Sequence, residues 1–450
     1  MIRTRAYRAS EIAKIVDGEL VGEDTLIDKI STDTREEWLD GICFFALSGD
    51  TFNGSDFIEL AVKKGVKLIV TQKIVQCNAP VIYVKDARIA FLKLAGDNIG
   101  KTKIIGVTGS VGKTTVKEMI KSVLSKKYKV CGTLDNHNNE IGVAQALFSI
   151  TDEDFCVLEM GMRKRGEIDL LASVSKPFVS VIVNAGNAHL EKLGSEEEIF
   201  KAKCEILSHT QEYSILPSEN RFKELDLGDV APIFIGESGD IFLEDILFET
   251  DGITYRARDK LFNTDFTVKI ESLFAHNCTN SLIAYCIGRL FDIPLESIQK
   301  GILEFKNCKN RENVFKLDKI TIIDDCYNSS YNSLKSALKA LIQYSQLERK
   351  PSYAIIGDML EIGENSKKYH EKIGEFARKI GVKKLYCYGE FSRYIYKGFK
   401  GGQEFFSKES LIDTFLSDIG KNDGVVLVKA SRGMEFEKII EILKERINEG

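Results

Sequence analysis

The middle of the chain alternates between short apolar runs and amphipathic stretches. Residues 103–107, 155–158 and 179–183 are apolar runs with the length of a buried strand. Each run is followed by glycine or polar residues and then by a helical pattern, as over residues 113–127. Strands that alternate with helices in this way are typical of a parallel sheet with crossover helices. The pattern therefore predicts an α/β unit.

Two further parts flank this unit. Residues 1–98 mix short strands and helices, and the alternation resumes at about residue 314. The strands expected in the last part are residues 320–323, 353–356, 384–388 and 425–428. Within the central part, Asp251-Gly252 separates two apolar runs, which is a hairpin signal. We therefore expect an antiparallel insertion over residues 233–270.

The composition narrows the class of protein. Hydrophobic residues make up 44% of the 450 residues, which is enough for packed cores. The 62 basic and 67 acidic residues leave a net charge of -5, which argues against a dedicated nucleic-acid binder. No apolar run approaches the roughly 18 to 20 residues of a membrane span, and the N-terminus has no hydrophobic signal core. We expect a cytoplasmic protein that neither binds nucleic acid nor inserts into a membrane.

One motif follows the first strand of the central unit and reads Gly-Val-Thr-Gly-Ser-Val-Gly-Lys-Thr-Thr over residues 106–115. Its glycines let the backbone turn tightly, so that successive N–H groups point at phosphate oxygens. Lys113 would reach the β- and γ-phosphates, and the Thr114 hydroxyl would face a magnesium ion. The spacing departs from G-x-x-x-x-G-K-[ST], because Val107 occupies the first glycine position. The expected nucleotide-binding residues are Thr108, Gly109, Ser110, Gly112, Lys113, Thr114 and Thr115.

The fold class predicted from these features is α/β with three domains. A small N-terminal α/β domain is expected over residues 1–98. The central domain, over residues 99–312, should have a P-loop-type, mostly parallel sheet with helices on both faces. A Rossmann-like α/β domain is expected over residues 313–450. A length of 450 residues is compatible with about three domains of roughly 150 residues each.

A phosphate loop alone indicates a bound triphosphate, because ATPase motors, kinases and GTPases share it. Three further blocks lie at residues 136–142 (Asn-His-Asn-Asn-Glu-Ile-Gly), 159–162 (Glu-Met-Gly-Met) and 357–363 (Gly-Asp-Met-Leu-Glu-Ile-Gly). Together with the loop, they resemble the ATP-dependent Mur ligases of peptidoglycan synthesis, and the resemblance covers nearly the whole chain. Among these ligases, the chain looks most like the one that adds D-alanyl-D-alanine. The Asp-Asn-Pro-Arg-like block of the ligase that adds the preceding residue is not found in the last domain.

The resemblance implies an ATP-dependent ligase that joins D-alanyl-D-alanine to UDP-N-acetylmuramoyl-tripeptide through an acyl phosphate. One or two Mg²⁺ ions would assist, and the N-terminal domain would recognise the UDP substrate. We expect a monomer with a hinge near residue 310, about which the third domain closes over the second. Two alternatives stay open. One is another Mur-type or folylpolyglutamate synthase-like amide ligase, and the other is a regulatory P-loop ATPase.

Glu159 and His189 each follow a strand of the expected parallel sheet, so both would project from its carboxyl edge beside the phosphate loop. A carboxylate and an imidazole there suit magnesium ligation, and the resemblance implies that role for both. In related ligases the lysine at the spacing of Lys203 is carbamylated, which turns a cation into an anion that can hold a second magnesium. Taken alone, Lys203 is compatible with a solvated helix lysine. The expected catalytic group is Lys113, Lys203, His189 and Glu159.

The resemblance implies further contacts outside this edge. Asn277 would read the adenine edge, Arg311 would lie by the phosphates and Asp325 would contact the ATP ribose. The implied substrate-binding residues are Ser31, Asp33, Arg35, Asn136, Asn138, Asn139, Tyr327, Asn328, Lys429, Ser431 and Arg432. Residues 327–333 read Tyr-Asn-Ser-Ser-Tyr-Asn-Ser and so depart from the family's Tyr-Asn-Ala-Asn-Pro-x-Ser.

Overall fold

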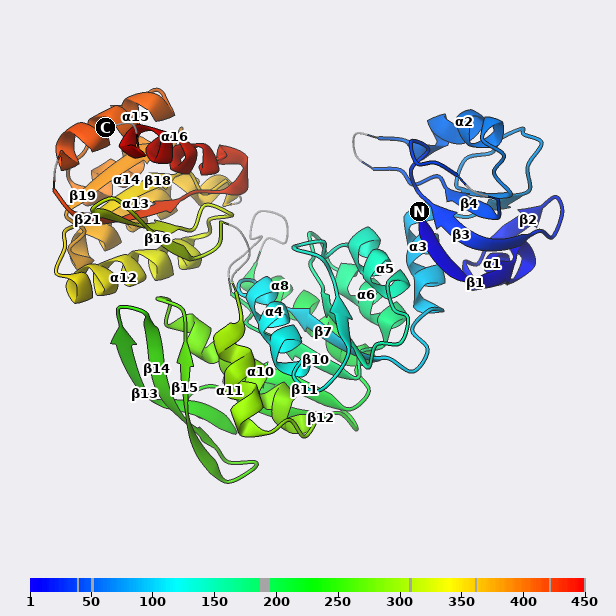
Figure 1. Ribbon diagram of the computed structural model, residues 1–450, viewed down its shortest axis with the longest axis horizontal. Coiled ribbons are helices and arrows are strands. Elements are labelled where there is room, and N and C mark those ends of the chain that lie inside the picture. The colour runs from blue at the N-terminus through cyan, green and yellow to red at the C-terminus, as the bar shows by residue number, and fades with distance from the viewer. Residues whose placement is uncertain are drawn as a thin grey trace.

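Three β-sheets follow one another along the chain, each with its own helices (Figure 1). The computed structural model describes residues 1–38, 40–49, 52–186, 195–306, 310–360, 362–420 and 422–448. The second sheet lies in the middle, with the first and third sheets on either side of it. The predicted α/β fold class is confirmed. The proposed domain limits at residues 98 and 312 both fall between sheets.

The first sheet has the strand order β1-β3-β4-β5-β6-β2. Strands β3 to β6 are parallel neighbours, whereas β1 and β2 pair in antiparallel orientation at the two edges. The strands are β1 (Ile2–Arg8), β2 (Glu19–Val21), β3 (Leu26–Ser31), β4 (Ile42–Phe45), β5 (Leu68–Thr71) and β6 (Val81–Tyr83). The helices are α1 (Ala9–Ile15), the 3-10 helix η1 (Gly54–Phe57), α2 (Ile58–Lys63) and α3 (Ala87–Gly96).

The central sheet has nine strands in the order β15-β14-β13-β12-β11-β10-β7-β9-β8. Its strands are β7 (Lys103–Thr108), β8 (Val130–Gly132), β9 (Phe155–Glu159), β10 (Val179–Ile182), β11 (Tyr213–Pro217), β12 (Ala231–Ile235), β13 (Ile241–Glu249), β14 (Gly252–Asp259) and β15 (Thr264–Ile270). Its helices are α4 (Lys113–Leu124), α5 (Glu140–Phe148), α6 (Glu167–Ser175), α8 (Glu196–Cys204), η2 (Glu205–His209), α9 (Asn220–Lys223), α10 (His276–Leu290) and α11 (Leu295–Glu304). Strands β7 to β12 pair in parallel.

The hairpin predicted at Asp251-Gly252 is present, because β13 and β14 pair antiparallel and meet at Glu249 and Gly252. The insertion begins later than expected. Residues from 233 still belong to β12, which is parallel to β11, and antiparallel pairing starts only with β13 and β14. An apolar strand such as β12 has the same sequence pattern whether it pairs in parallel or in antiparallel orientation. The sequence therefore could not show where antiparallel pairing begins.

Alternate residues of the central strands face opposite helix layers. Ile104 packs in a cluster with α5, α6 and α8, whereas its neighbour Ile105 packs with α4, α10 and α11. In β9 the same split separates Leu158 from Val157. Strands that are apolar on both faces are expected where a parallel sheet is buried between helices. The prediction of helices on both faces is confirmed.

The third sheet has the order β16-β17-β21-β18-β19-β20, and all its pairs are parallel except β16 with β17. The strands are β16 (Asn313–Leu317), β17 (Ile320–Asp324), β18 (Ser352–Gly357), β19 (Lys384–Tyr388), β20 (Glu404–Phe405) and β21 (Gly424–Lys429). The helices are α12 (Tyr331–Glu348), η3 (Gly363–Asn365), α13 (Ser366–Ile380), α14 (Ser392–Phe399), α15 (Lys408–Ile419), η4 (Arg432–Met434) and α16 (Glu437–Asn448). Among the residues described, no helix is both long and apolar enough to cross a membrane.

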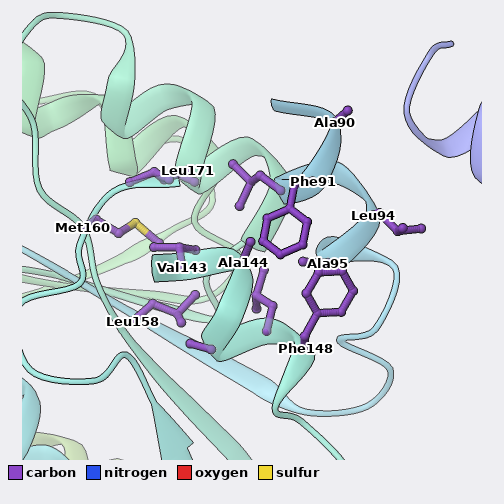
Figure 2. Packing of buried hydrophobic residues seen from close by; sticks show 14 of the residues in the cluster. Ala90, Phe91, Leu94, Ala95, Val143, Ala144, Phe148, Leu158, Met160 and Leu171 are labelled. Carbon is purple, nitrogen blue, oxygen red and sulfur yellow. The ribbon is translucent and has the colours of Figure 1, made fainter. Parts of the chain in front are cut away.

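Helix α3 connects the first sheet to the central one through a continuous hydrophobic core (Figure 2). The Phe91 side chain is fully buried between two other rings. Its centroid lies 5.3 Å from that of Phe45 in β4 and 5.1 Å from that of Phe148 in α5. Figure 2 shows Phe91 and Ala95 of α3 beside Ala144 and Phe148 of α5. The first sheet is therefore attached by burial of apolar surface.

Replacing Phe91 with alanine should lower the free energy of unfolding by about 3–5 kcal/mol, because it leaves a cavity among buried rings. The control is Leu60→Ala in α2, where the side chain is 42% exposed and the expected loss is about 0.5 kcal/mol or less. Denaturant unfolding of the purified chain measures both. Equal losses for the two variants would contradict the account of this core.

Candidate active site

The phosphate loop joins the end of β7 to the start of α4. Gly112 caps the N-terminus of α4 with φ of 88°, a left-handed conformation that favours glycine. A Cβ atom there would lie 3.2 Å from Val183 and 3.3 Å from Asn280, so the site is also crowded. The Lys113 ammonium folds back and donates to the carbonyl of Gly109 at 2.9 Å. The N–H groups at a helix N-terminus and an adjacent lysine together suit the binding of phosphate.

Asn184, in the segment that follows β10, forms hydrogen bonds with the backbone of this loop. Its Oδ1 accepts hydrogen bonds from the backbone N–H groups of Ser110 and Val111, both at 3.1 Å. Its Nδ2 donates to the carbonyl of Val111 at 2.8 Å. The Ser110 hydroxyl donates to the carbonyl of Gly186 at 2.7 Å. The segment after β10 therefore holds the backbone of the loop in place.

A buried carboxylate lies beside the loop at the end of β9. Glu159 is 1% exposed, and its Oε2 accepts a hydrogen bond from the Thr114 hydroxyl at 2.7 Å. Its Oε1 accepts one from Asn138 Nδ2 at 2.8 Å. Carboxylate and hydroxyl oxygens are the donors that Mg²⁺ prefers, so Thr114 and Glu159, two of the expected ligands, fit that ion. The structure brings them together as the sheet topology predicts.

His189, a further expected ligand, lies outside the described residues. Within the described part of the chain there is no group of three or more His, Cys, Asp or Glu side chains that could hold a metal ion.

Lys203 is buried in α8 and is 1% exposed. Burial lowers the pKa of its ammonium well below the usual range for lysine, and the nearby charge of Lys113 lowers it further. Lys201, two residues earlier, pairs with Glu198 at 3.3 Å and is 46% exposed. Of these two lysines, Lys203 is therefore the buried one, and its charge interacts with that of Lys113.

The start of α10 and the segment after residue 309 meet beside the loop. The Asn277 amide donates to Glu312 at 2.5 Å and to the Ser272 hydroxyl at 2.8 Å, and its oxygen accepts from Asn280 at 2.8 Å. His276 pairs with Glu312 at 2.8 Å. Burial lowers the pKa of His276, but the Glu312 carboxylate outweighs this effect and the net shift is upward. Both the nitrogen and the oxygen of the Asn277 side-chain amide therefore form hydrogen bonds with protein groups.

A second group of expected residues gathers at the carboxyl edge of the third sheet. The Lys429 ammonium donates to Asp325 at 2.5 Å and to the carbonyl of Asn328 at 2.8 Å. Burial raises the pKa of the Asp325 carboxyl to about 6, although the Lys429 charge acts in the opposite direction. The Ser431 hydroxyl donates to the carbonyl of Ser329 at 3.1 Å. These contacts give the edge a fixed shape.

Two guanidinium groups lie near the ring of Tyr327 at this edge. The guanidinium carbon of Arg311 lies 3.8 Å from the ring centroid, and that of Arg432 lies 5.8 Å from it. Arg432 also donates to Glu437 at 3.0 Å. Arg311 is therefore close to the third sheet through a cation–π contact.

The expected residues of the first sheet form a separate cluster. The Ser31 hydroxyl donates to Glu36 at 2.7 Å and lies 3.0 Å from the carbonyl oxygen of Asp33. Arg35 pairs with Asp33 at 2.6 Å, and its side-chain hydrogen bonds lower the pKa of that carboxyl to about 2. Of the other expected residues, Asn139 caps α5 by accepting from the Gly142 N–H, and Asn136 is exposed. The expected residues thus form three groups, one on each sheet.

Two residues with clear contacts at the site were not among the expected ones, namely Asn184 and Lys117. Asn184 lies in the turn Asn-Ala-Gly that follows β10, and its position at the carboxyl end of a strand next to β7 could have indicated it. Lys117 lies one turn after Lys113 on α4 and is fully buried. A lysine at a buried helix position has no such signal in the sequence.

Comparison with known proteins agrees with this geometry. The Mur ligase middle domain matches residues 107–288, and the Mur ligase, glutamate ligase domain matches residues 310–432. The chain belongs to the Mur ligase family, as the sequence resemblance indicated, and is an ATP-dependent ligase.

Particular members of the family resemble the whole chain. It is 34% identical to the UDP-N-acetylmuramoyl-tripeptide–D-alanyl-D-alanine ligase of Buchnera aphidicola, over 97% of each chain. A crystal structure of MurF from Acinetobacter baumannii superimposes with a TM-score of 0.91 at 25% identity, covering 99% of this chain and 100% of the other. A crystal structure of MurF ligase from Thermotoga maritima in complex with ADP gives a TM-score of 0.84 at 28% identity, covering 94% and 98%.

Replacing Asn184 with alanine should weaken MgADP binding about tenfold or more, because three hydrogen bonds to the loop backbone are lost. Isothermal titration calorimetry measures the affinity. The control is Asn98→Ala, since the Asn98 amide also donates two structural hydrogen bonds, to the carbonyls of Leu147 and Ile150, away from the loop. An equal loss of MgADP affinity in both variants would show that Asn184 has no special role.

Proposed function

We propose that this chain joins D-alanyl-D-alanine to UDP-N-acetylmuramoyl-tripeptide in the cytoplasm, with conversion of ATP to ADP and phosphate. The observation that carries the proposal is the phosphate loop with Lys113 beside the buried Thr114–Glu159–Asn138 set. Relatives named UDP-N-acetylmuramoyl-tripeptide–D-alanyl-D-alanine ligase match nearly the full length of the chain. Formation of a peptide bond fits a site that would hold a triphosphate beside buried anionic and cationic groups.

The chemistry requires activation of a carboxylate. A carboxylate does not react with an amine at neutral pH, because an oxide would have to leave. Attack of the tripeptide carboxylate on the γ-phosphorus forms an acyl phosphate and releases ADP. The dipeptide amine then attacks the carbonyl carbon, loses a proton, and phosphate leaves from the tetrahedral intermediate.

In this proposal Lys113 and the N-terminus of α4 balance the charge on the transferring phosphoryl group. The loop residues Thr108, Gly109, Ser110, Gly112 and Thr115 complete the phosphate cradle. Asn138 would fix the Glu159 carboxylate, since it already donates to it. Asn136 and Asn139 would contact the tripeptide from the same segment.

Mg²⁺, when bound, would neutralise phosphate charge and polarise the γ-phosphate. Thr114 and Glu159 would hold it, with His189 as a further ligand. Lys203 would contribute if it is carbamylated, because the carbamate is an anion. The low pKa of Lys203 supports this role, since the neutral amine is the form that reacts with carbon dioxide.

The other two sheets would bring the remaining substrates. Ser31, Asp33 and Arg35 on the first domain would contact the uridine nucleotide. On the third domain, Asp325 would bind the ATP ribose. The residues proposed to contact the dipeptide are Tyr327, Asn328, Lys429, Ser431 and Arg432. Asn277 and Arg311 would lie by the nucleotide, on the adenine and phosphate sides respectively.

We place the hinge near residue 310, in a chain that acts as a monomer. Asn310 and Glu312 both have left-handed backbone conformations, with φ of 61° and 52°. A change of backbone conformation at such residues would let the segment that joins the two domains bend. Closure about this point would bring the dipeptide amine to the acyl phosphate and exclude water.

Phosphate release should require ATP, the tripeptide substrate and D-alanyl-D-alanine together, and Lys113→Ala should reduce it at least a thousandfold. A coupled phosphate assay measures the rate, with Lys126→Ala as the control, because Lys126 lies just beyond the far end of α4 and pairs with Glu304. Release of phosphate from ATP alone would favour a regulatory ATPase. Release with a folate and glutamate would favour a folylpolyglutamate synthase-like ligase.

Lys203 should bear a carbamate. Protein equilibrated with ¹³C-bicarbonate should show a carbamate carbon resonance by NMR that is missing from Lys203→Ala, and ligation by this variant should fall at least a hundredfold. The control is Lys201→Ala, because Lys201 is exposed and paired with glutamates. A carbamate signal that persists in Lys203→Ala would assign the modification elsewhere.

A further inference from the structure

Lys117 is a fully buried lysine that the proposed chemistry does not use. It lies on α4, one helical turn after Lys113, and its side chain is 0% exposed. Its ammonium donates to the carbonyls of Thr133 and Asp135, both at 2.7 Å, and pairs with Glu118 at 2.9 Å. A lysine ammonium has three donors, so all of them are satisfied. A buried charge with a complete set of partners holds those partners firmly.

The two carbonyls belong to the segment that carries the asparagines of the site. Thr133 follows the edge strand β8 and is 0% exposed, and its hydroxyl accepts a hydrogen bond from the Glu159 N–H at 2.9 Å. Asp135 has φ of 43°, a left-handed conformation that is uncommon for a non-glycine residue. The hydrogen bond from the Lys117 ammonium to the Asp135 carbonyl helps to hold this conformation.

These contacts close into a ring. Lys117 binds Thr133, Thr133 binds the backbone of Glu159, and the Glu159 carboxylate binds Thr114, which is three residues before Lys117 on the same helix. From Glu159 a branch leads to Asn138, whose carbonyl also accepts from the Gly161 N–H at 2.8 Å. The helix that presents the phosphate loop is thereby tied to the segment over residues 133–139.

We propose that Lys117 is a positioning residue that sets the segment over residues 133–139 against the phosphate loop, and so aligns the tripeptide carboxylate with the γ-phosphate. This inference rests on the proposed function, in which that segment contacts the tripeptide. Lys117 does not touch the nucleotide in this scheme. Its loss should therefore impair the use of the tripeptide and leave nucleotide binding in place.

The test compares Lys117→Met, which keeps the length of the side chain without its donors, with Lys121→Met. Lys121 is the matched control, because it lies on the next turn of α4 and pairs with the same Glu118 at 3.1 Å. In the full-length protein, Lys117→Met should raise KM for the tripeptide substrate at least tenfold. KM for ATP and the calorimetric affinity for MgADP should change less than threefold, and Lys121→Met should stay within twofold of the wild type throughout.

Lys117→Arg serves as the conservative variant. It keeps the charge and the donors but displaces them, so KM for the tripeptide should lie severalfold above the wild-type value and below that of Lys117→Met. If Lys117→Met does not fold, Lys117→Arg carries the test, because its displaced donors should still raise that KM severalfold with MgADP affinity unchanged. An unchanged KM for the tripeptide in the variant that folds would overturn the proposal. So would an equal loss of MgADP affinity, or a lowered melting temperature with both KM values unchanged.

The wild-type protein separates this inference from the proposed function. If the wild type does not ligate the muramoyl tripeptide, the proposed function fails before any variant is compared. If the wild type ligates it and Lys117→Met keeps the same KM, the positioning role alone fails.

Discussion

The hydrogen bond from the Thr114 hydroxyl to the Glu159 carboxylate joins the two halves of the central site. Thr114 stands at the start of the helix after the phosphate loop, and Glu159 stands at the end of the neighbouring parallel strand. A carboxylate that is 1% exposed needs partners for both oxygens, because an unpaired buried charge is strongly unfavourable. Thr114 and Asn138 meet that need, and their positions in turn fix the loop, the strand end and the asparagine segment.

Local patterns predicted the framework of this site. The strand, glycine turn and helix around Gly112 give the phosphate loop, since each part depends on residues close in sequence. The position of Glu159 at the end of an apolar run is sufficient to place it at the carboxyl edge of a parallel sheet. The early start assigned to the antiparallel insertion was wrong, because the orientation of a strand depends on its neighbours. His189 stays a prediction, since it lies outside the described residues.

The contacts that hold the framework could not be predicted in the same way. Asn184 binds loop residues more than 70 positions away in the sequence. Lys117 binds carbonyl groups, and the sequence carries no record of which carbonyls lie near a given lysine. The stacking of Arg311 on Tyr327 also depends on how the segment after residue 309 meets the third sheet. Such pairings follow from tertiary geometry rather than from residue type or spacing.

The two joints of the molecule differ in kind. Phe91 and its aromatic neighbours pack between the first and second sheets, and separating the two sheets would expose these rings to water. The joint to the third sheet includes polar pairs of His276 with Glu312 and with Ser336, beside the contact of Leu273 and Phe274. Water can replace polar partners at little net cost. Under the proposed function, the phosphoryl transfer would take place on the two sheets that share an aromatic core, and the acceptor amine would arrive on the sheet that is joined to them partly through polar contacts.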